Sequence, residues 1–209
     1  MKNIIYIVLL VLLLTACSSD GTLKITNRTK HEIYLSIDGV DYTLSGYQNL
    51  DINSHVLEID LATESDFLGN SGKAYVLDIE GETFALWDDF NNIVVPSTEV
   101  TINPDKTTTV FCDPDYACVR ITNNSSVIVE YANYIMSNEE VPRLIGGSQN
   151  ILPQQSIYYR LEYLSNLEID PEDRFYYTFQ VTMVDSTIYE FGDENNFLHK
   201  DDLYHIVIE

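Results

Sequence analysis

The amino-acid sequence predicts an all-β protein with two tandem antiparallel β-sandwich domains that arose by an internal duplication. Three observations lead to this prediction. Apolar and polar residues alternate along many short segments, clusters of Asn, Asp, Gly and Ser separate those segments at hairpin-like intervals, and several short segments recur in the same order in both halves. No long window of the sequence has the periodicity of a helix.

Four segments show the alternation most clearly. Successive side chains of a strand point to opposite faces, so this pattern is typical of an antiparallel strand with one buried and one wet face. The residues expected on the buried faces are Ile33, Leu35 and Ile37; Leu57, Ile59 and Leu61; Ile157, Tyr159, Leu161 and Tyr163; and Phe175, Tyr177, Phe179, Val181 and Met183. Turn-forming pairs such as Asp38-Gly39 and Glu80-Gly81 lie between such segments.

The duplication is predicted from short echoes between the halves. Leu23–Arg28 is echoed by Val119–Asn124, Gly46–Leu50 by Gly147–Ile151, and Thr83–Asn92 by Thr187–Asn196. Each echo is weak by itself, but their common order favours two diverged copies. The echoes pair three sets of positions that should be equivalent: Ile25 with Ile121, Trp87 with Phe191, and Asn91–Asn92 with Asn195–Asn196.

We therefore expect one sandwich over residues 23–113 and a second over residues 114–209. Each copy has the length of a small sandwich of the immunoglobulin-like or prealbumin-like kind. The boundary falls at Asp113-Pro114-Asp115, a turn-prone stretch between two strand-like runs.

The first nineteen residues have the layout of an export signal. Lys2 supplies the positive charge, and Ile4–Leu14 is an apolar run that is too short for a comfortable membrane span of roughly 20 residues. The run ends in Leu14-Thr15-Ala16-Cys17, which resembles a bacterial lipobox. By this resemblance, residues 1–16 are a lipoprotein signal peptide, and Cys17 carries the lipid, with palmitate among its acyl chains. The alternative is an ordinary secretory signal with an incidental cysteine.

The resemblance also implies a location. Residues 17–22 would form a short lipidated tether that holds the first sandwich close to the membrane. Ser18 after the cysteine is compatible with the outer membrane under the sorting rule of enteric bacteria, on either its periplasmic face or the cell surface. The membrane, reached through the lipid on Cys17, is therefore the first expected partner.

Two further cysteines, Cys112 and Cys118, flank the predicted domain boundary. An exported chain meets an oxidising compartment, so we expect a disulfide between them that restrains the hinge. The alternative is two reduced thiols packed near strand ends.

The sequence offers no catalytic signature. It has no G-x-S-x-G nucleophile elbow, no phosphate-binding loop, and four histidines without metal-ligand spacing. Asp88-Asp89 and Asp201-Asp202 are the carboxylate pairs that a glycosidase would need, but adjacent strand residues point to opposite faces. We therefore assign no catalytic residue and no cofactor, and we expect that the protein is not an enzyme.

One polar motif recurs in the third echo: Asp89 and Asn91 correspond to Asp193 and Asn195. Their oxygens are suitable Ca²⁺ ligands, although the spacing does not match an EF-hand. Asp and Asn also stabilise turns through bonds to their own backbone, which explains the recurrence without a metal. We prefer the turn and keep calcium as the weaker alternative.

Exposed tyrosines are the other candidate site. The alternation places Tyr34, Tyr158 and Tyr176 on the wet faces of strands, where rigid amphipathic rings could bind a sugar or a protein. The alternative is cross-strand packing of aromatic rings that stiffens the sheet.

A net charge of −22 argues against nucleic acid as a partner, because such a surface repels phosphates. The sequence therefore favours a non-catalytic envelope lipoprotein whose two sandwiches bind a glycan or a protein partner or serve a structural role. An inhibitor or assembly factor of another envelope protein is the first alternative, and a hydrolase acting on glycans is the more distant one.

Overall fold

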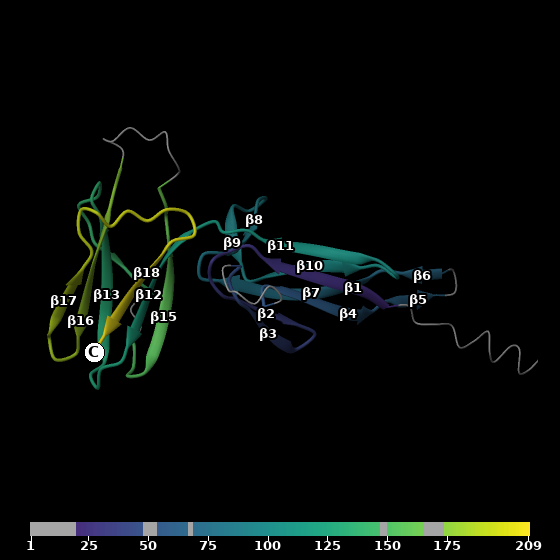
Figure 1. Ribbon diagram of the computed structural model, residues 1–209, viewed down its shortest axis with the longest axis horizontal. Helices are drawn as coiled ribbons and strands as arrows, with labels where there is room; N and C mark the ends of the chain where they lie inside the picture. The colour runs from purple at the N-terminus through teal and green to yellow at the C-terminus, as the bar shows by residue number, and fades with distance from the viewer. Residues whose placement is uncertain (1–19, 48–53, 67–68, 147–149, 165–173) are drawn as a thin grey trace, which may run out of the picture.

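The computed structural model describes residues 20–47, 54–66, 69–146, 150–164 and 174–209, and every regular element in them is a β-strand (Figure 1). Within these ranges, no helix has the length and hydropathy of a membrane span. The predicted all-β class is confirmed. The leader with Cys17 lies outside the described residues.

The first sandwich is built from seven strands in two sheets. The strands are β1 (Asp20–Asn27), β2 (Ile33–Ile37), β3 (Val40–Leu44), β4 (Val56–Ala62), β7 (Lys73–Gly81), β10 (Ser97–Ile102) and β11 (Thr107–Cys112). One sheet has the order β11-β1-β4, and the other has the order β10-β7-β2-β3.

The second sandwich is built in the same way. Its strands are β12 (Ala117–Asn123), β13 (Val129–Met136), β14 (Arg143–Leu144), β15 (Gln155–Leu161), β16 (Tyr177–Met183), β17 (Ile188–Phe191) and β18 (Leu203–Ile208). Its sheets have the orders β15-β12-β18 and β14-β13-β16-β17. Read from the opposite edge, as β18-β12-β15 and β17-β16-β13-β14, these orders match those of the first sandwich strand for strand, so the predicted pair of tandem sandwiches is confirmed.

The sequence had led us to expect purely antiparallel sheets, but each three-stranded sheet contains one parallel pair. β1 runs parallel to β11, and β12 runs parallel to β18. The physical reason is the same in both halves. The last strand crosses over from the four-stranded sheet to lie beside the first strand, and such a crossover permits a parallel pair, whereas a tight hairpin does not.

Each sandwich has a separate apolar core. Leu23, Ile25, Leu77 and Ile102 are among the fully buried residues of the first core, and Ile121 belongs to the second. Ile25 and Ile121 are both completely buried, as the first echo predicted.

A buried asparagine explains that echo. Asn27 ends β1, and its Nδ2 donates to the carbonyl oxygens of His31 (2.7 Å) and Ser45 (2.9 Å). Its Oδ1 accepts from the backbone N–H of Thr29 (2.8 Å). The side chain thereby fixes the chain between β1 and β2 and ties it to the end of β3.

Asn123 plays the same part at the end of β12. Its Nδ2 donates to the carbonyl oxygens of Val127 (2.8 Å) and Ile151 (3.0 Å), and its Oδ1 accepts from Ser125 N–H (3.1 Å). The Ile-Thr-Asn motif therefore recurs because both sandwiches need a buried amide at this turn.

The third echo, in contrast, is wrong as a structural equivalence. Trp87 lies on β8 (Leu86–Asp88), which pairs with β9 (Ile93–Val95) in a separate hairpin, and its side chain is 47% exposed. Phe191 lies on β17, which pairs with β16 as β10 pairs with β7. The counterpart of β17 is therefore β10. Asn91–Asn92 lie in the β8–β9 turn and Asn195–Asn196 lie after β17, so these loops are not equivalent.

The second echo is only partly described. A Cβ at Gly46 would lie 2.0 Å from the carbonyl oxygen of Lys30, so this position requires glycine. Residues 48–50 and 147–149, which complete the echo, lie outside the described residues. The first half also contains a short hairpin of β5 (Glu64–Asp66) and β6 (Gly69–Ser71).

The predicted disulfide between Cys112 and Cys118 is not present, and both thiols are free and buried. Cys112 packs into the core of the first sandwich. Cys118 alternates with the core residues Ala117 and Val119 on β12, so its side chain points away from the second core. The short spacing therefore does not bring the two sulfur atoms to a common face.

Candidate functional site

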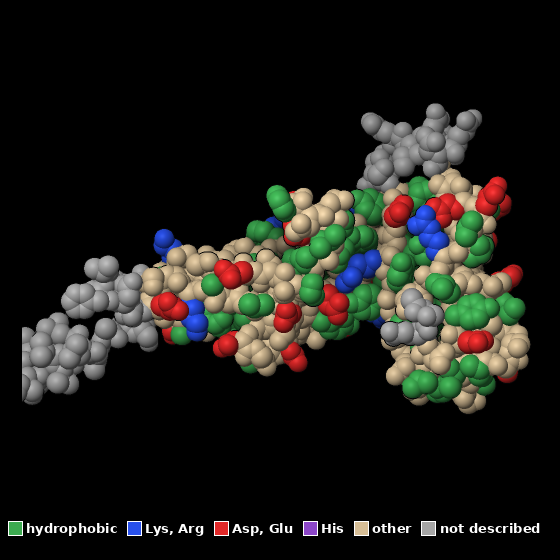
Figure 2. All heavy atoms as spheres, turned by 180° about the vertical axis from the view of Figure 1, so that it is seen from behind, with side chains coloured by type: hydrophobic (Ala, Val, Ile, Leu, Met, Phe, Trp, Pro, Cys, Tyr) green, Lys and Arg blue, Asp and Glu red, His purple; other side chains and the backbone are tan. Residues whose placement is uncertain are grey.

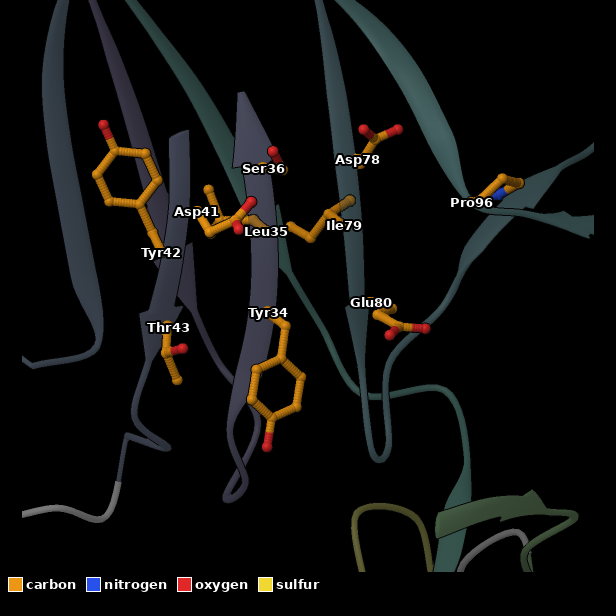
Figure 3. A pocket seen from close by; sticks show the side chains of 10 residues that line it. All are labelled: Tyr34, Leu35, Ser36, Asp41, Tyr42, Thr43, Asp78, Ile79, Glu80 and Pro96. Atoms are coloured by element: carbon orange, nitrogen blue, oxygen red, sulfur yellow. The ribbon is translucent and has the colours of Figure 1, made fainter. Parts of the chain in front are cut away.

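The candidate site is a hollow of about 530 Å³ on the outer face of the sheet β10-β7-β2-β3 (Figure 3). Alternation along β2, β3 and β7 turns their core residues inward and their polar residues outward. The outward side chains that line the hollow are Tyr34, Ser36, Asp41, Thr43, Asp78 and Glu80, and Pro96 closes one side.

Strand register arranges these side chains in two rows across the sheet. Asp41, Ser36 and Asp78 form the first row. Thr43, Tyr34 and Glu80 form the second. Neighbouring strands lie about 4.8 Å apart, so each row presents three polar groups over roughly 10 Å, which is the scale of a small ligand.

The hollow is anionic. Within the described part of the chain, neither Asp41 nor Asp78 has a Lys or Arg partner. Both residues are exposed, so their carboxylates are hydrated and can accept hydrogen bonds from a ligand. Ser36, half-buried between them, can donate or accept.

Tyr34 is the one predicted platform residue that lines this hollow. Its hydroxyl donates to Glu32 Oε2 (3.0 Å). Burial, followed by this hydrogen bond and by the charges of Glu32 and Glu82, raises the pKa of Tyr34 to about 12. The ring therefore stays neutral at physiological pH and is suited to stacking.

One end of the hollow meets the second sandwich. Arg160 on β15 places Nη2 3.8 Å from Glu80 Oε2, and its guanidinium lies over the ring of Tyr158. Burial is the main cause that raises the pKa of Tyr158 to about 12, and a hydrogen bond with Glu80 contributes. Tyr158, the second predicted platform residue, thus lies at the junction of the sandwiches rather than on a free face.

The junction itself is a polar network around the turn that follows β7. Glu82 is only 2% exposed, and its Oε1 accepts from Arg120 Nε (2.8 Å) on β12. Its Oε2 faces the ring of His31, with Nδ1 3.9 Å away. Gly81 contributes a carbonyl oxygen that accepts from Arg160 Nε (2.9 Å).

Asp201 completes the network from the second sandwich. Its carboxylate, 5% exposed, accepts from Thr83 Oγ1 (2.6 Å) and from the backbone N–H of Lys30 (2.8 Å). The carbonyl oxygen of Thr83 accepts from the N–H of Tyr116 (3.1 Å). Buried polar groups of both sandwiches therefore bind one another, although Glu82 Oε2 and Arg160 Nη2 have no hydrogen-bond partner among the described residues, and this network, rather than a disulfide, joins the sandwiches.

Tyr176, the third predicted platform residue, lies apart from the hollow's lining. It precedes β16, is half-buried and packs edge-on against Phe197. Its backbone pairs with Ser137. The structure therefore brings Tyr34 and Tyr158 towards one another at Glu80 but does not unite all three rings in one platform.

The residues considered for calcium lie in turns. Asn91 donates through N–H (3.2 Å) and Nδ2 (2.6 Å) to the carboxylate of Asp88, the residue before Asp89. Asn195 N–H donates to Asp193 Oδ1 (2.8 Å). Both arrangements stabilise a turn locally. Among the described residues, no group of three or more His, Cys, Asp or Glu side chains could hold a metal ion.

The second sandwich has a hollow of about 290 Å³ on the corresponding face, between β13, β16 and β17. Its lining includes Asn133, Gln180 and Glu190. Asn133 and Gln180 pair across β13 and β16 as Ser36 and Asp78 pair across β2 and β7. The two hollows therefore overlap at these paired positions, where the first sandwich has Ser36 and Asp78 and the second has two amides.

Sequence analysis missed most residues of the acidic hollow. Ser36, Asp41, Thr43, Asp78 and Glu80 are the polar positions of alternating strands, which is a visible signal. Their convergence depends on the register between strands, which pairs lining residues up to 46 positions apart, as Tyr34 with Glu80. In the same way, Ser36 pairs with Asp78 on one side and with Asp41 on the other.

Comparisons with known proteins identify no family. No protein-family model and no curated protein matches the chain. Solved structures that resemble it include a candidate adhesin from Bacteroides ovatus, with 11% identity and a TM-score of 0.30 over 90% of this chain and 88% of that one.

Two further solved structures resemble the chain at similarly low sequence identity and TM-score. A fimbrial protein from Bacteroides ovatus matches with 8% identity and a TM-score of 0.33 over 92% of this chain and 49% of its own length. The Bacillus anthracis TIE protein matches with 9% identity and a TM-score of 0.29 over 91% of this chain and 34% of its own. This chain thus spans about half and a third of those two proteins, and at such scores none of the three supports a functional inference.

Proposed function

We propose that the protein is a non-catalytic, lipid-anchored envelope protein that binds a glycan in the acidic hollow of its first sandwich. The observation that carries this proposal is the double row of polar side chains beside the ring of Tyr34. A sugar ring presents hydroxyl donors along its rim and C–H groups on its face, so it needs both kinds of group at once.

The chemistry of the hollow fits that need. Asp41 and Asp78 can accept hydrogen bonds from sugar hydroxyls, and bonds to charged acceptors are the stronger kind. Ser36 between them can serve as donor or acceptor. The neutral ring of Tyr34 offers a stacking surface at low entropic cost. No bond is made or broken in this proposal.

A glycan-array screen of the exported chain from Ser18 to Glu209, followed by titration of the strongest glycan, tests the proposal. Asp78→Ala should weaken binding at least tenfold, which corresponds to about 1.4 kcal/mol. Gln180→Ala, at the corresponding position of the second sandwich, is the matched control and should leave the affinity unchanged. Binding that both variants preserve, or a silent array, would overturn the proposal.

The anchor is a separate part of the proposal, and it is supported by the lipobox-like sequence that ends in Cys17. β1 begins at the end of the first sandwich that lies away from the second (Figure 1), so a lipid near Ser18 would hold the first sandwich closest to the membrane, with the outer membrane the expected site. Cys17→Ala should abolish labelling by a palmitate analogue. Undiminished labelling of that variant would exclude Cys17 as the lipid attachment site.

A further inference from the structure

The β8–β9 hairpin exposes four large apolar side chains close together in the sequence. Phe90 at its tip is 95% exposed, and Trp87, Ile93 and Val94 are each about half exposed, at 47%, 51% and 46%. In Figure 1 the hairpin stands out from the first sandwich near the end that faces the second, and Figure 2 shows hydrophobic side chains protruding at that place. These residues do not line the acidic hollow, so a role of the hairpin would be independent of the proposed glycan site.

The hairpin is a built structure rather than a loose loop. Trp87 pairs directly with Val94 across the ribbon, so their side chains share one face. Leu86, on the opposite face, packs against the first core and anchors the base. The carboxylate of Asp88 accepts from Phe90 N–H (2.9 Å) and from Asn91 Nδ2 (2.6 Å), which fixes the turn that carries Phe90 outward.

The fold does not require this element. In the second sandwich, the strands that correspond to β7 and β10 are joined by the short turn 184–187, and the strand order is the same. Large apolar side chains gathered in solvent are uncommon on soluble proteins and mark binding surfaces. Trp87, the only tryptophan of the chain, is an aromatic type that is enriched at interface hot spots.

We propose that the β8–β9 hairpin is a docking element that inserts Phe90 and Trp87 into an apolar cleft with a basic rim on a partner protein. The charge of the hairpin selects this partner. Asp88 and Asp89 directly precede Phe90, so a cleft that receives the ring must lie beside two carboxylates. Hydrogen bonds from Asn91 lower the pKa of Asp88, which keeps its carboxylate charged. Lys or Arg at the rim of the cleft would complement these charges.

The same charges disfavour other occupants. A lipid surface would have to desolvate Asp88 and Asp89 to receive Phe90. A second copy would bring the same carboxylates together, in addition to the −22 net charge of each chain. A sugar would meet few free hydrogen-bonding groups beside Trp87, whose cross-strand neighbour is Val94.

The test uses the tryptophan as its own reporter. The exported chain from Ser18 to Glu209 is immobilised, and random peptides displayed on phage are selected against it. The strongest peptide is then synthesised and titrated while Trp87 emission is recorded. We expect selected peptides to combine Lys or Arg with apolar residues, and their binding to shift Trp87 emission to shorter wavelength because the indole leaves water.

Three variants sharpen the test. Phe90→Ser should weaken peptide binding at least tenfold, and its fold should persist because the ring is almost fully exposed. Asp89→Lys should weaken the preference for basic peptides, because the introduced positive charge offsets the carboxylate of Asp88. Val141→Ser removes a 69% exposed side chain from the second sandwich and is the matched control, which should bind like the unchanged protein.

Four results would overturn the proposal. The first is that the selected peptides lack basic residues, and the second is that they bind Phe90→Ser and the unchanged protein equally. The third is that phosphatidylcholine vesicles shift Trp87 emission. The fourth is that the protein forms a concentration-dependent dimer that Phe90→Ser abolishes. The vesicle result would assign the hairpin to membranes, and the dimer result would assign it to a second copy. None of these results bears on the glycan hollow, so the two proposals can fail separately.

Discussion

The first and second sandwiches place a buried asparagine at the same turn and a buried tyrosine on the same strand. Tyr75 on β7 donates its hydroxyl to the carbonyl oxygen of Ala62 (2.7 Å), at the end of β4. Tyr177 on β16 donates to the carbonyl oxygen of Glu162 (2.8 Å), just after β15. Each hydroxyl ties the four-stranded sheet to an edge strand of the facing sheet.

Their surfaces differ where their frameworks agree. The first sandwich has an acidic hollow and an exposed hairpin, whereas the second has a smaller hollow that includes two amides and one carboxylate, and a short turn in place of the hairpin. This contrast teaches that the recurring residues maintain the fold, while the residues that differ are the ones to examine for function. Substitutions at positions that maintain the fold should therefore lower the free energy of unfolding by similar amounts in both halves.

The largest loss of stability is expected at the junction, where the two sandwiches contribute different residues. Arg120→Met leaves Glu82, 2% exposed, without its guanidinium partner. Breaking a buried pair in this way costs about 4 kcal/mol, so we expect the contact between the sandwiches to open and the two to unfold in separate steps. Urea unfolding is followed by Trp87 emission, which reports on the first sandwich, and by far-ultraviolet circular dichroism, which reports on both. We expect the two signals to give separate unfolding transitions.

A second Arg–Glu pair provides the control for that measurement. Arg143 pairs with Glu139 on the surface of the second sandwich, where both side chains are partly exposed. Arg143→Met removes this exposed ion pair and one hydrogen bond with Tyr134. The substitution should therefore cost about 1 kcal/mol. Similar small losses for both arginines, with a single shared transition, would show that the junction network does not couple the sandwiches.

The next largest effect tests the shared framework directly. Asn27→Ala and Asn123→Ala each remove a buried amide that donates to carbonyl oxygens of neighbouring turns, and each leaves a backbone N–H, of Thr29 or Ser125, without its acceptor. We expect each to cost about 3 kcal/mol, because the buried side chain makes several hydrogen bonds at once and water cannot replace them. Hydrogen exchange should become faster in β1–β3 for the first variant and in β12–β14 for the second.

Asn124→Ala is the control, since this neighbouring side chain is exposed. It should change stability by less than about 0.5 kcal/mol. If one of the two asparagine variants changed the free energy of unfolding as little as this control does, the two turns would not contribute equally to stability, despite their matching hydrogen bonds.

These asparagines also show what sequence reasoning could and could not reach. The alternation of apolar residues was enough to predict the sandwiches, because burial of one sheet face imposes it. The echo that ends in Asn27 and Asn123 was a true equivalence, because a buried amide with several hydrogen-bond partners tolerates little substitution. The echo around Trp87 was wrong, because an inserted hairpin happens to contain similar residues.

The candidate site was harder to predict for a physical reason. Tyr34 was singled out by its place on a wet face, but its neighbours in the hollow come from three strands. Sequence spacing does not give the register between strands that are distant along the chain. The disulfide prediction was wrong for a related reason: a separation of a few residues does not determine which face each cysteine occupies.

The thiols give the third prediction, which compares a cysteine in one core with a cysteine at the junction. Burial raises the pKa of Cys112 and of Cys118 to about 12, whereas the unfolded thiols ionise near pH 9.0. Their contribution to stability is therefore complete below about pH 9 and is lost between about pH 9 and 12, because the unfolded chain releases these protons first.

At pH 10 the loss is about 1.4 kcal/mol for each thiol, one pH unit above the unfolded pKa. Urea unfolding at pH 8 and at pH 10 measures this loss in the free energy of unfolding. The variant with both Cys112→Ala and Cys118→Ala should lose less of its free energy of unfolding between the two pH values than the unchanged protein does. Mass mapping without reductant should find both thiols free, and alkylation at pH 8 should require unfolding. A linked Cys112–Cys118 peptide would contradict the structure.

The smallest effect concerns the paired tyrosines. Tyr75→Phe and Tyr177→Phe each remove one hydroxyl and leave one carbonyl oxygen, of Ala62 or Glu162, without its donor. A single lost hydrogen bond of this kind costs about 1 kcal/mol. Because both hydroxyls make the same connection, the two losses in the free energy of unfolding should agree within about 0.5 kcal/mol. Tyr189→Phe, on an exposed ring of β17, should be close to neutral. A large loss at Tyr177 with none at Tyr75 would mean that only the second sandwich depends on this connection, and the equivalence of the two frameworks would then end at strand order.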